Sequence, residues 1–137
     1  MTTPADSPRA QYRADRVTMD AMTTPTPRAI RASALQQRLL SGEPLLLVDV
    51  REPAELEMAA LQEPVLHLPL SRSAEWLERI ESLIGRDQTV VVLCHAGIRS
   101  WQFACWLMEA QGYDDVLNLQ GGIDAWSVEV DPSVPRY

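Results

Sequence analysis

The stretch TVVVLCHAGIRS, residues 89–100, opens with a continuous apolar run and changes to small and polar residues after Cys94. A short run that is apolar on both faces is typical of a central strand in a parallel sheet. A helical pattern follows from about Ser100 to Gln111, and Gly112 is well placed to end it. The stretch therefore predicts a strand, a short loop and a helix, which is the repeating unit of parallel α/β folds.

Apolar runs and helical patterns alternate on both sides of this stretch. Further strands are predicted at residues 45–49, 65–68 and 116–119. Helices are predicted from the capping-box pattern Ser33–Gln36 to Gly42, after Glu52-Pro53, over residues 76–84 and over residues 123–127. This alternation indicates an open α/β fold with a mainly parallel sheet of about five strands flanked by helices. Ligands in such folds bind beyond the carboxyl ends of the strands, which directs attention to the loop after the central strand.

Composition and charge exclude several classes of protein. The chain has 137 residues and a formal net charge of −7, which predicts one domain and argues against a nucleic-acid-binding protein. No apolar run approaches the roughly 18 residues of a membrane span. The amino-terminal residues also lack the apolar centre of a secretory signal. We therefore expect a cytoplasmic protein without a nucleic-acid or membrane partner.

The amino-terminal part differs from the rest. Residues 1–27 are rich in Pro, Thr, Ala and Asp and have no lasting apolar period, so they predict a disordered extension before a domain at residues 28–137. Met-Thr-Thr-Pro occurs at both Met1 and Met22, which makes Met22 a second candidate for the natural start.

The chain has two cysteines in different contexts. They make neither a disulfide scaffold nor a zinc motif. Cys105 lies in an apolar helical stretch and predicts core packing. Cys94 stands where a strand meets a helix, facing N–H groups that lack partners within the helix. Those donors should lower the pKa of the thiol and supply thiolate near neutral pH. Gly97 permits the tight loop that this needs, and Arg99 adds a permanent cation suited to an anionic substrate.

Three segments together resemble the rhodanese-like domain family. Residues 94–100, CHAGIRS, look like its active-site loop; residues 48–53, VDVREP, resemble its early aspartate–arginine motif; and residues 117–126, LNLQGGIDAW, resemble its closing glycine–glycine–tryptophan motif. The likeness spans about residues 29–137, and the ending VDPSVPRY, residues 130–137, is similar to a bacterial single-domain subgroup. Residues 61–65, LQEPV, depart from the family's pattern before the second strand.

The resemblance implies a sulfurtransferase with a rhodanese-like fold. Cys94 would attack a sulfane sulfur, as in thiosulfate, become a persulfide, and pass the outer sulfur to a thiol or cyanide. A protein sulfur donor or acceptor is a further expected partner, and neither a metal nor an organic cofactor is needed. The residues expected to bind substrate are those that follow the cysteine in the loop: His95, Ala96, Gly97, Ile98, Arg99 and Ser100.

Neighbouring side chains receive supporting roles. Ser100 is expected to cap the helix and to touch the sulfur with its hydroxyl. Asp49 is expected to support backbone near the loop, and Arg51 to pair with a local carboxylate. His95 is left between two interpretations, a contact with the substrate anion or a solvent-facing side chain.

Other functions are compatible with the same motifs. A persulfide carrier in a protein sulfur relay would also use Cys94. A binding module is disfavoured because the cysteine is present. Phosphatases of the same fold have five residues between cysteine and arginine, whereas four separate Cys94 from Arg99 here. The resemblance to the rhodanese-like family therefore implies that the shorter loop favours sulfur over phosphate.

Overall fold

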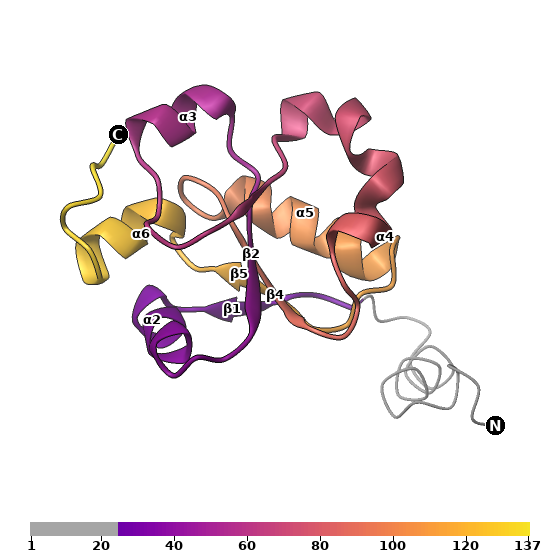
Figure 1. The fold of residues 1–137 in the computed structure, drawn as a ribbon, viewed down its shortest axis with the longest axis horizontal. Helices are drawn as coiled ribbons and strands as arrows, with labels where there is room; N and C mark the ends of the chain where they lie inside the picture. The colour runs from indigo at the N-terminus through magenta and orange to yellow at the C-terminus, as the bar shows by residue number, and fades with distance from the viewer. Residues whose placement is uncertain (1–24) are drawn as a thin grey trace.

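A computed structural model describes residues 25–137, which contain one five-stranded parallel sheet in the order β1-β5-β4-β2-β3 (Figure 1). The strands are β1 (Arg28–Ile30), β2 (Leu45–Asp49), β3 (Leu66–His67), β4 (Thr89–Leu93) and β5 (Val116–Leu119). All the pairings are parallel. The expected open α/β architecture is confirmed, and β4 is the central strand as its sequence predicts.

Helices cover both faces of the sheet. They are α2 (Ala32–Leu40), α3 (Pro53–Met58), the 3₁₀ segments η2 (Leu70–Glu75) and η3 (Leu77–Arg79), α4 (Ile80–Leu83), α5 (Ile98–Glu109) and α6 (Gly122–Glu129). One core cluster joins α4 and α5 to Val90 and Val92, and the other joins α2 and α6 to Val91 and Leu93. Successive β4 side chains thus enter opposite cores. Each fully buried side chain of this size contributes about 1.5–3 kcal/mol.

The edge strand β1 was not predicted. Arg28 and Ala29 are exposed and only Ile30 is buried, so the strand shows no alternating or continuous apolar pattern. Its register depends on a contact between residues far apart in the sequence, because Ile30 pairs with Leu119 of β5. A strand this short cannot be predicted from its own residues, because it is defined by its pairing with β5.

Two helix predictions need correction. Ser33 does not form a capping box, because α2 begins at Ala32 and has Arg31 at its N-cap. The continuous helix expected over residues 76–84 is broken into η3 and α4, with Trp76 in a non-helical conformation just before them. The Trp76 indole donates a hydrogen bond to the carbonyl of Pro69 at 3.0 Å, which anchors the ring in the core at the point where the helical conformation breaks.

Gly42 and Gly112 lie just beyond α2 and α5 with positive φ, as expected of residues that end helices. The disordered extension predicted over residues 1–27 lies, except for residues 25–27, outside the described part of the chain. Across residues 25–137, no helix combines the length and the apolarity needed to span a bilayer.

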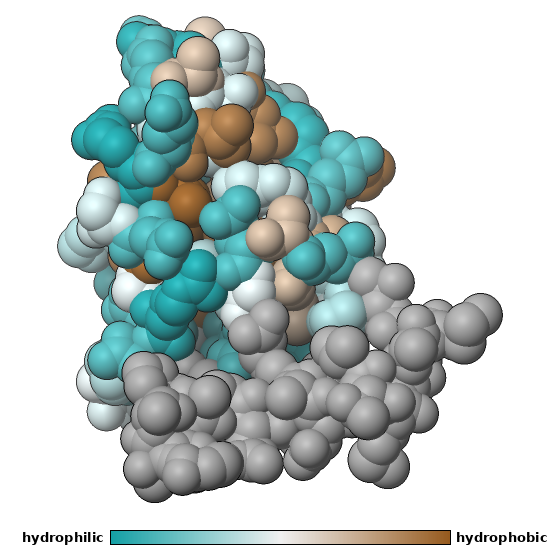
Figure 2. Space-filling model, turned by 90° about the vertical axis from the view of Figure 1, so that its right-hand side faces the viewer, coloured by the Kyte–Doolittle hydropathy of each residue, from teal (hydrophilic) through white to brown (hydrophobic). Residues whose placement is uncertain are grey.

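Hydrophobic side chains also reach the surface. Figure 2 shows them gathered above the middle of one face, ringed by hydrophilic residues. Leu77 and Trp101 are among the large apolar side chains that are partly exposed within the described residues. The loop that contains Cys94 lies instead beyond the carboxyl end of β4, on the side where Figure 1 places α3 near the carboxyl terminus of the chain.

Candidate active site around Cys94

Cys94 follows the last residue of β4, and its Sγ accepts two described hydrogen bonds. The Gly97 N–H donates at 3.1 Å and the Ser100 hydroxyl at 3.2 Å. Burial alone, with 1% of the residue exposed, would raise the pKa of the thiol. The Ser100 hydroxyl and the backbone N–H groups of Ser100, Gly97 and Ala96 outweigh burial, and the pKa of Cys94 lies below its usual value. The site therefore stabilises a buried thiolate.

The loop takes this shape because of two glycines. Gly97 is the N-cap residue of α5 with φ +106°, a conformation that other residues resist. Gly122, with φ +62°, lies so close to the loop that a Cβ would come within 2.4 Å of the His95 carbonyl oxygen and 2.5 Å of that of Cys94. The close approach lets the first turn of α6 hold the loop: Ile123 N–H donates to the Cys94 carbonyl at 2.9 Å, and Asp124 N–H to that of His95 at 3.1 Å.

Ser100 links the thiol to Asn118 of β5. Its hydroxyl lies 2.5 Å from Asn118 Oδ1, while Asn118 Nδ2 donates to the Gly97 carbonyl at 3.1 Å. A hydroxyl carries one proton, so Ser100 donates either to Asn118 or to Cys94 at a given moment. The predicted contact of Ser100 with the sulfur is present. The predicted cap is not, because Ser100 lies inside α5. Asn118 was missed, although a polar residue within the apolar run 116–119 is a signal that could have found it.

Arg99 forms a two-pronged ion pair with Glu55 of α3. Its Nη1 lies 2.7 Å from Glu55 Oε2, and its Nη2 lies 2.8 Å from Oε1. These bonds raise the pKa of Arg99 further above its usual value. The Arg99 bonds also lower the pKa of Glu55 to about 2 against the opposing effect of burial, helped by the Glu52 N–H and the Tyr137 hydroxyl. Glu55 was missed; its signal was a glutamate three residues after Glu52 at the start of a proline-led helix.

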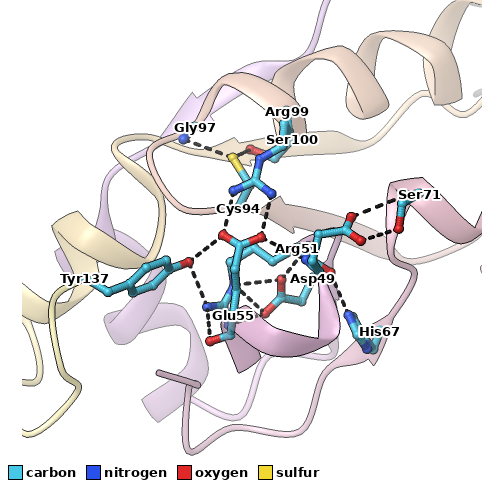
Figure 3. Close-up of polar contacts among 11 residues, drawn as sticks. Asp49, Arg51, Glu55, His67, Ser71, Cys94, Gly97, Arg99, Ser100 and Tyr137 are labelled. Carbon is cyan, nitrogen blue, oxygen red and sulfur yellow. Dashed lines mark hydrogen bonds and ion pairs between the residues drawn. The ribbon is translucent and has the colours of Figure 1, made fainter. Parts of the chain in front are cut away.

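Tyr137 connects this ion pair to Arg51, as Figure 3 shows. Its hydroxyl donates to Glu55 Oε1 at 2.8 Å and accepts a hydrogen bond from Arg51 Nη1 at 3.1 Å. Arg51 is fully buried and pairs with Asp49, whose Oδ1 also accepts the Arg51 backbone N–H at 3.0 Å. The local carboxylate expected for Arg51 is therefore Asp49, and that aspartate supports backbone as expected.

The other loop residues divide between the site and the surface. The His95 ring stacks on the Tyr137 ring, with centroids 4.1 Å apart and planes 13° apart, an arrangement that neither earlier interpretation of His95 included. Ala96 is exposed, although its N–H is one of the donors that lower the pKa of Cys94. Ile98 is 71% exposed. The structure thus brings Gly97, Arg99 and Ser100 together around Cys94 and leaves the Ile98 side chain in solvent.

The arrangement suits a nucleophilic sulfur whose ionisation is favoured by hydrogen-bond donors. Among residues 25–137, no group of three or more histidine, cysteine or acidic side chains is placed to hold a metal ion. The N–H groups that favour the thiolate point at one small volume around Sγ. A second sulfur bonded to Sγ would carry negative charge into the same set of donors.

Comparison with known proteins yields one consistent family. The model of the rhodanese-like domain matches residues 31–129. A sulfurtransferase of Allochromatium vinosum is 42% identical over 102 residues, which are 72% of this chain and 86% of that protein. The rhodanese-like/PpiC domain-containing protein 12, chloroplastic, of Arabidopsis thaliana is 45% identical over 92 residues, 66% of this chain.

The extent of these matches differs. The matched region makes up 30% of the Arabidopsis protein. Among solved structures, a rhodanese-related protein of Thermoplasma volcanium has a TM-score of 0.59 and 27% identity, over 80% of this chain and 99% of that one. Similarity in sequence and in structure thus extends over most of the described domain.

Proposed function

The chain belongs to the rhodanese-like domain family, and from that premise we propose that it is a sulfurtransferase that carries sulfane sulfur as a persulfide on Cys94. The Allochromatium protein, named a sulfurtransferase, supports the general activity. The observation that carries the assignment to Cys94 is the lowered pKa of a buried thiol at the carboxyl end of β4, surrounded by hydrogen-bond donors.

The first half-reaction is a displacement at sulfur. The Cys94 thiolate attacks the outer sulfur of the donor and forms an S–S bond, while the donor's own bond to that sulfur breaks. With thiosulfate the leaving group is sulfite, which departs with the electron pair of the broken bond. The donors Gly97 N–H and Ser100 hydroxyl stabilise the thiolate before attack. The persulfide anion that results retains one negative charge for the same donors.

The second half-reaction returns the enzyme to its starting state. A thiolate or cyanide attacks the outer sulfur of the persulfide, and Cys94 leaves as thiolate. A low pKa makes Cys94 a good leaving group as well as an available nucleophile, so the same hydrogen bonds serve both directions. No electron acceptor or donor is consumed, because each step exchanges one sulfur bond for another.

The test is the mass of the protein after exposure to thiosulfate. We expect the wild-type protein to gain the mass of one sulfur atom on the peptide that contains Cys94, and to lose it on addition of cyanide. Cys94→Ser should gain nothing. A mass increase on Cys105 alone, or sulfur transfer by Cys94→Ser at the wild-type rate, would refute the proposal.

A control addresses the phosphatase alternative. Four residues separate Cys94 from Arg99, one fewer than in phosphatases of the same fold. We expect no useful hydrolysis of p-nitrophenyl phosphate by the wild-type protein. Efficient hydrolysis that is lost in Cys94→Ser would assign the site to phosphate instead.

A further inference from the structure

Arg99, the cation expected to bind an anionic sulfur donor, already forms an ion pair within the protein. Arg99 gives both terminal nitrogens to Glu55, at 2.7 and 2.8 Å. Figure 3 shows the Arg99 guanidinium between the Cys94 sulfur and the Glu55 carboxylate. The negative charges of both Glu55 and Cys94 raise the pKa of Arg99, which places the guanidinium within electrostatic reach of each. A donor oxygen that binds Arg99 must therefore compete with a carboxylate.

Glu55 is not free to move aside, because three elements hold it. Oε2 accepts the Glu52 N–H at 2.9 Å within the capping box of α3. Oε1 accepts the Tyr137 hydroxyl at 2.8 Å, and Arg99 occupies both oxygens from the α5 side. Tyr137 is fixed in turn by Arg51 and by its stacking on His95. The carboxylate is thus a built part of the site with only 14% of its side chain exposed.

The charges around Sγ sum to a negative value when Cys94 is ionised. Arg99 contributes one positive charge, Glu55 and the Cys94 thiolate contribute one negative charge each, and Asp49 and Arg51 cancel. A dianionic donor entering this partly desolvated site is repelled twice as strongly as a monoanion, because Coulomb energy is proportional to the charge. A donor with one charge or none meets little penalty.

We propose that Glu55, positioned by Tyr137, sets the donor class of this site: it disfavours dianions such as thiosulfate and favours a persulfide of low charge, such as one on a cysteine of a protein. This inference rests on the proposed function and refines it. Glu55 acts here as a specificity-determining residue, and Tyr137 as a positioning residue.

Two small sulfur donors that differ in charge but react in the same way allow the effect of charge to be measured. Thiosulfate is a dianion and methanethiosulfonate is a monoanion, yet both present an outer sulfur bonded to a sulfonyl sulfur. The Cys94 thiolate takes that outer sulfur from either one and releases sulfite or methanesulfinate with the electron pair of the broken bond. The rate of persulfide formation on Cys94 is followed for each donor by mass spectrometry in a single turnover.

Glu55→Gln is compared with Glu57→Gln, which removes the same charge from an exposed position of α3. We expect Glu55→Gln to load about tenfold faster with thiosulfate and only about threefold faster with methanethiosulfonate. Doubling the charge doubles the free-energy change and so squares the ratio of rates. Glu57→Gln should change neither rate by more than about 1.5-fold, because exposed charges are screened.

Tyr137→Phe provides a second variant that keeps the ring and removes the hydroxyl bond to Glu55. It should shift the thiosulfate rate in the same direction by about threefold, the effect of losing one hydrogen bond of modest strength. The melting temperatures of all variants establish whether they are folded. If Glu55→Gln does not fold, Tyr137→Phe still tests the proposal.

The outcomes distinguish the two proposals. Equal acceleration with both donors, unchanged rates, or slower loading with thiosulfate in the folded Glu55→Gln and Tyr137→Phe proteins would overturn the role of Glu55 while leaving the persulfide chemistry intact. If neither donor modifies Cys94 in the wild-type protein, the proposed function itself fails.

Discussion

The two cysteines of this chain lie in adjoining segments, and their thiols are perturbed in opposite directions. Cys94 ends the run of β4 and its pKa is lowered, although it is the more buried of the two. Cys105 lies in the middle of α5, where burial and the charge of Glu109 raise the pKa of its thiol. Burial by itself opposes ionisation at both positions, so burial cannot explain the difference.

The difference comes from the hydrogen-bond donors around Cys94, which are the Ser100 hydroxyl and backbone N–H groups that have no other partner. Within a helix, each N–H donates to the carbonyl four residues earlier, so the N–H groups around Cys105 are occupied. The first N–H groups of a helix have no such partners. Ser100 in the first turn of α5, with Ala96 and Gly97 in the loop just before it, supplies such unoccupied N–H groups to Cys94. The comparison indicates that the loop before α5 and its first turn, and not the cysteine residue as such, lower the pKa of Cys94.

The largest expected effect follows removal of the Cys94 sulfur, with removal of the Cys105 sulfur as the comparison. Cys94→Ser should abolish thiosulfate:cyanide sulfur transfer, because no other thiol occupies the loop. Cys105→Ser should keep most of the activity, since that side chain lies within α5 outside the loop; it is only partly buried and lies outside both core clusters, so the predicted core packing is not seen. Steady-state assays of both variants measure this. Comparable losses in the two variants would show that the comparison has no functional meaning.

The second prediction concerns a substitution that changes the shape of the loop and leaves both cysteines in place. Gly122→Ala places a Cβ against the carbonyl oxygens of Cys94 and His95, so it should destabilise the protein by about 3 kcal/mol or more and reduce sulfur transfer. Gly42→Ala is the matched control. Gly42 also has a positive φ, +80°, but nothing lies within 4 Å of the added carbon. It should cost only about 1–2 kcal/mol and leave activity unchanged. Denaturant unfolding of both variants provides the free energies, and equal costs would mean that the loop tolerates displacement.

The third prediction concerns the pH at which each thiol reacts. In a pH series of iodoacetamide alkylation, the midpoint for Cys94 should lie below the value of about 8.5 for free cysteine, and the midpoint for Cys105 above it. Thiolate is the reactive form, so a lower pKa moves the rise in rate to lower pH. Peptide mass spectrometry follows both sites in one sample. Because midpoints are compared and not absolute rates, the restricted access of iodoacetamide to Cys94 slows its reaction without moving its midpoint. Coinciding midpoints would contradict the role assigned to the helix start.

Local patterns predicted the central part of the site, and long-range contacts account for what they missed. Residues 89–100 were interpretable because β4 is apolar on both faces and its loop carries its own donors. Glu55 meets Arg99 across 44 positions and Tyr137 across 82, so neither contact follows from spacing along the chain. The apolar spacing of residues 76–84 likewise marked buried positions at Trp76 and Ile80 correctly but could not show that the Trp76 indole bonds to Pro69.

The smallest expected effect isolates a single hydrogen bond to the sulfur. Ser100→Ala removes the hydroxyl that donates to Cys94 and leaves the N–H donors of the loop in place. Loss of a donor to the thiolate favours the thiol, so the pKa of Cys94 should rise, and alkylation below that pKa should slow by about three- to tenfold.

Stability must be separated from this electrostatic effect, because Ser100→Ala also leaves the buried Asn118 Oδ1 without the donor described here, at a cost of about 1–3 kcal/mol. Ser127→Ala is the matched control: Ser127 is a buried serine of α6 whose hydroxyl donates to the Val134 carbonyl at 2.6 Å, in no contact with Cys94 among the described hydrogen bonds. It should lower the melting temperature similarly while leaving the alkylation profile of Cys94 unchanged. A shift of equal size in both variants would attribute the effect to loosened packing. A shift confined to Ser100→Ala would show that the Ser100 hydroxyl, in addition to the N–H groups, makes the pKa of Cys94 lower than that of Cys105.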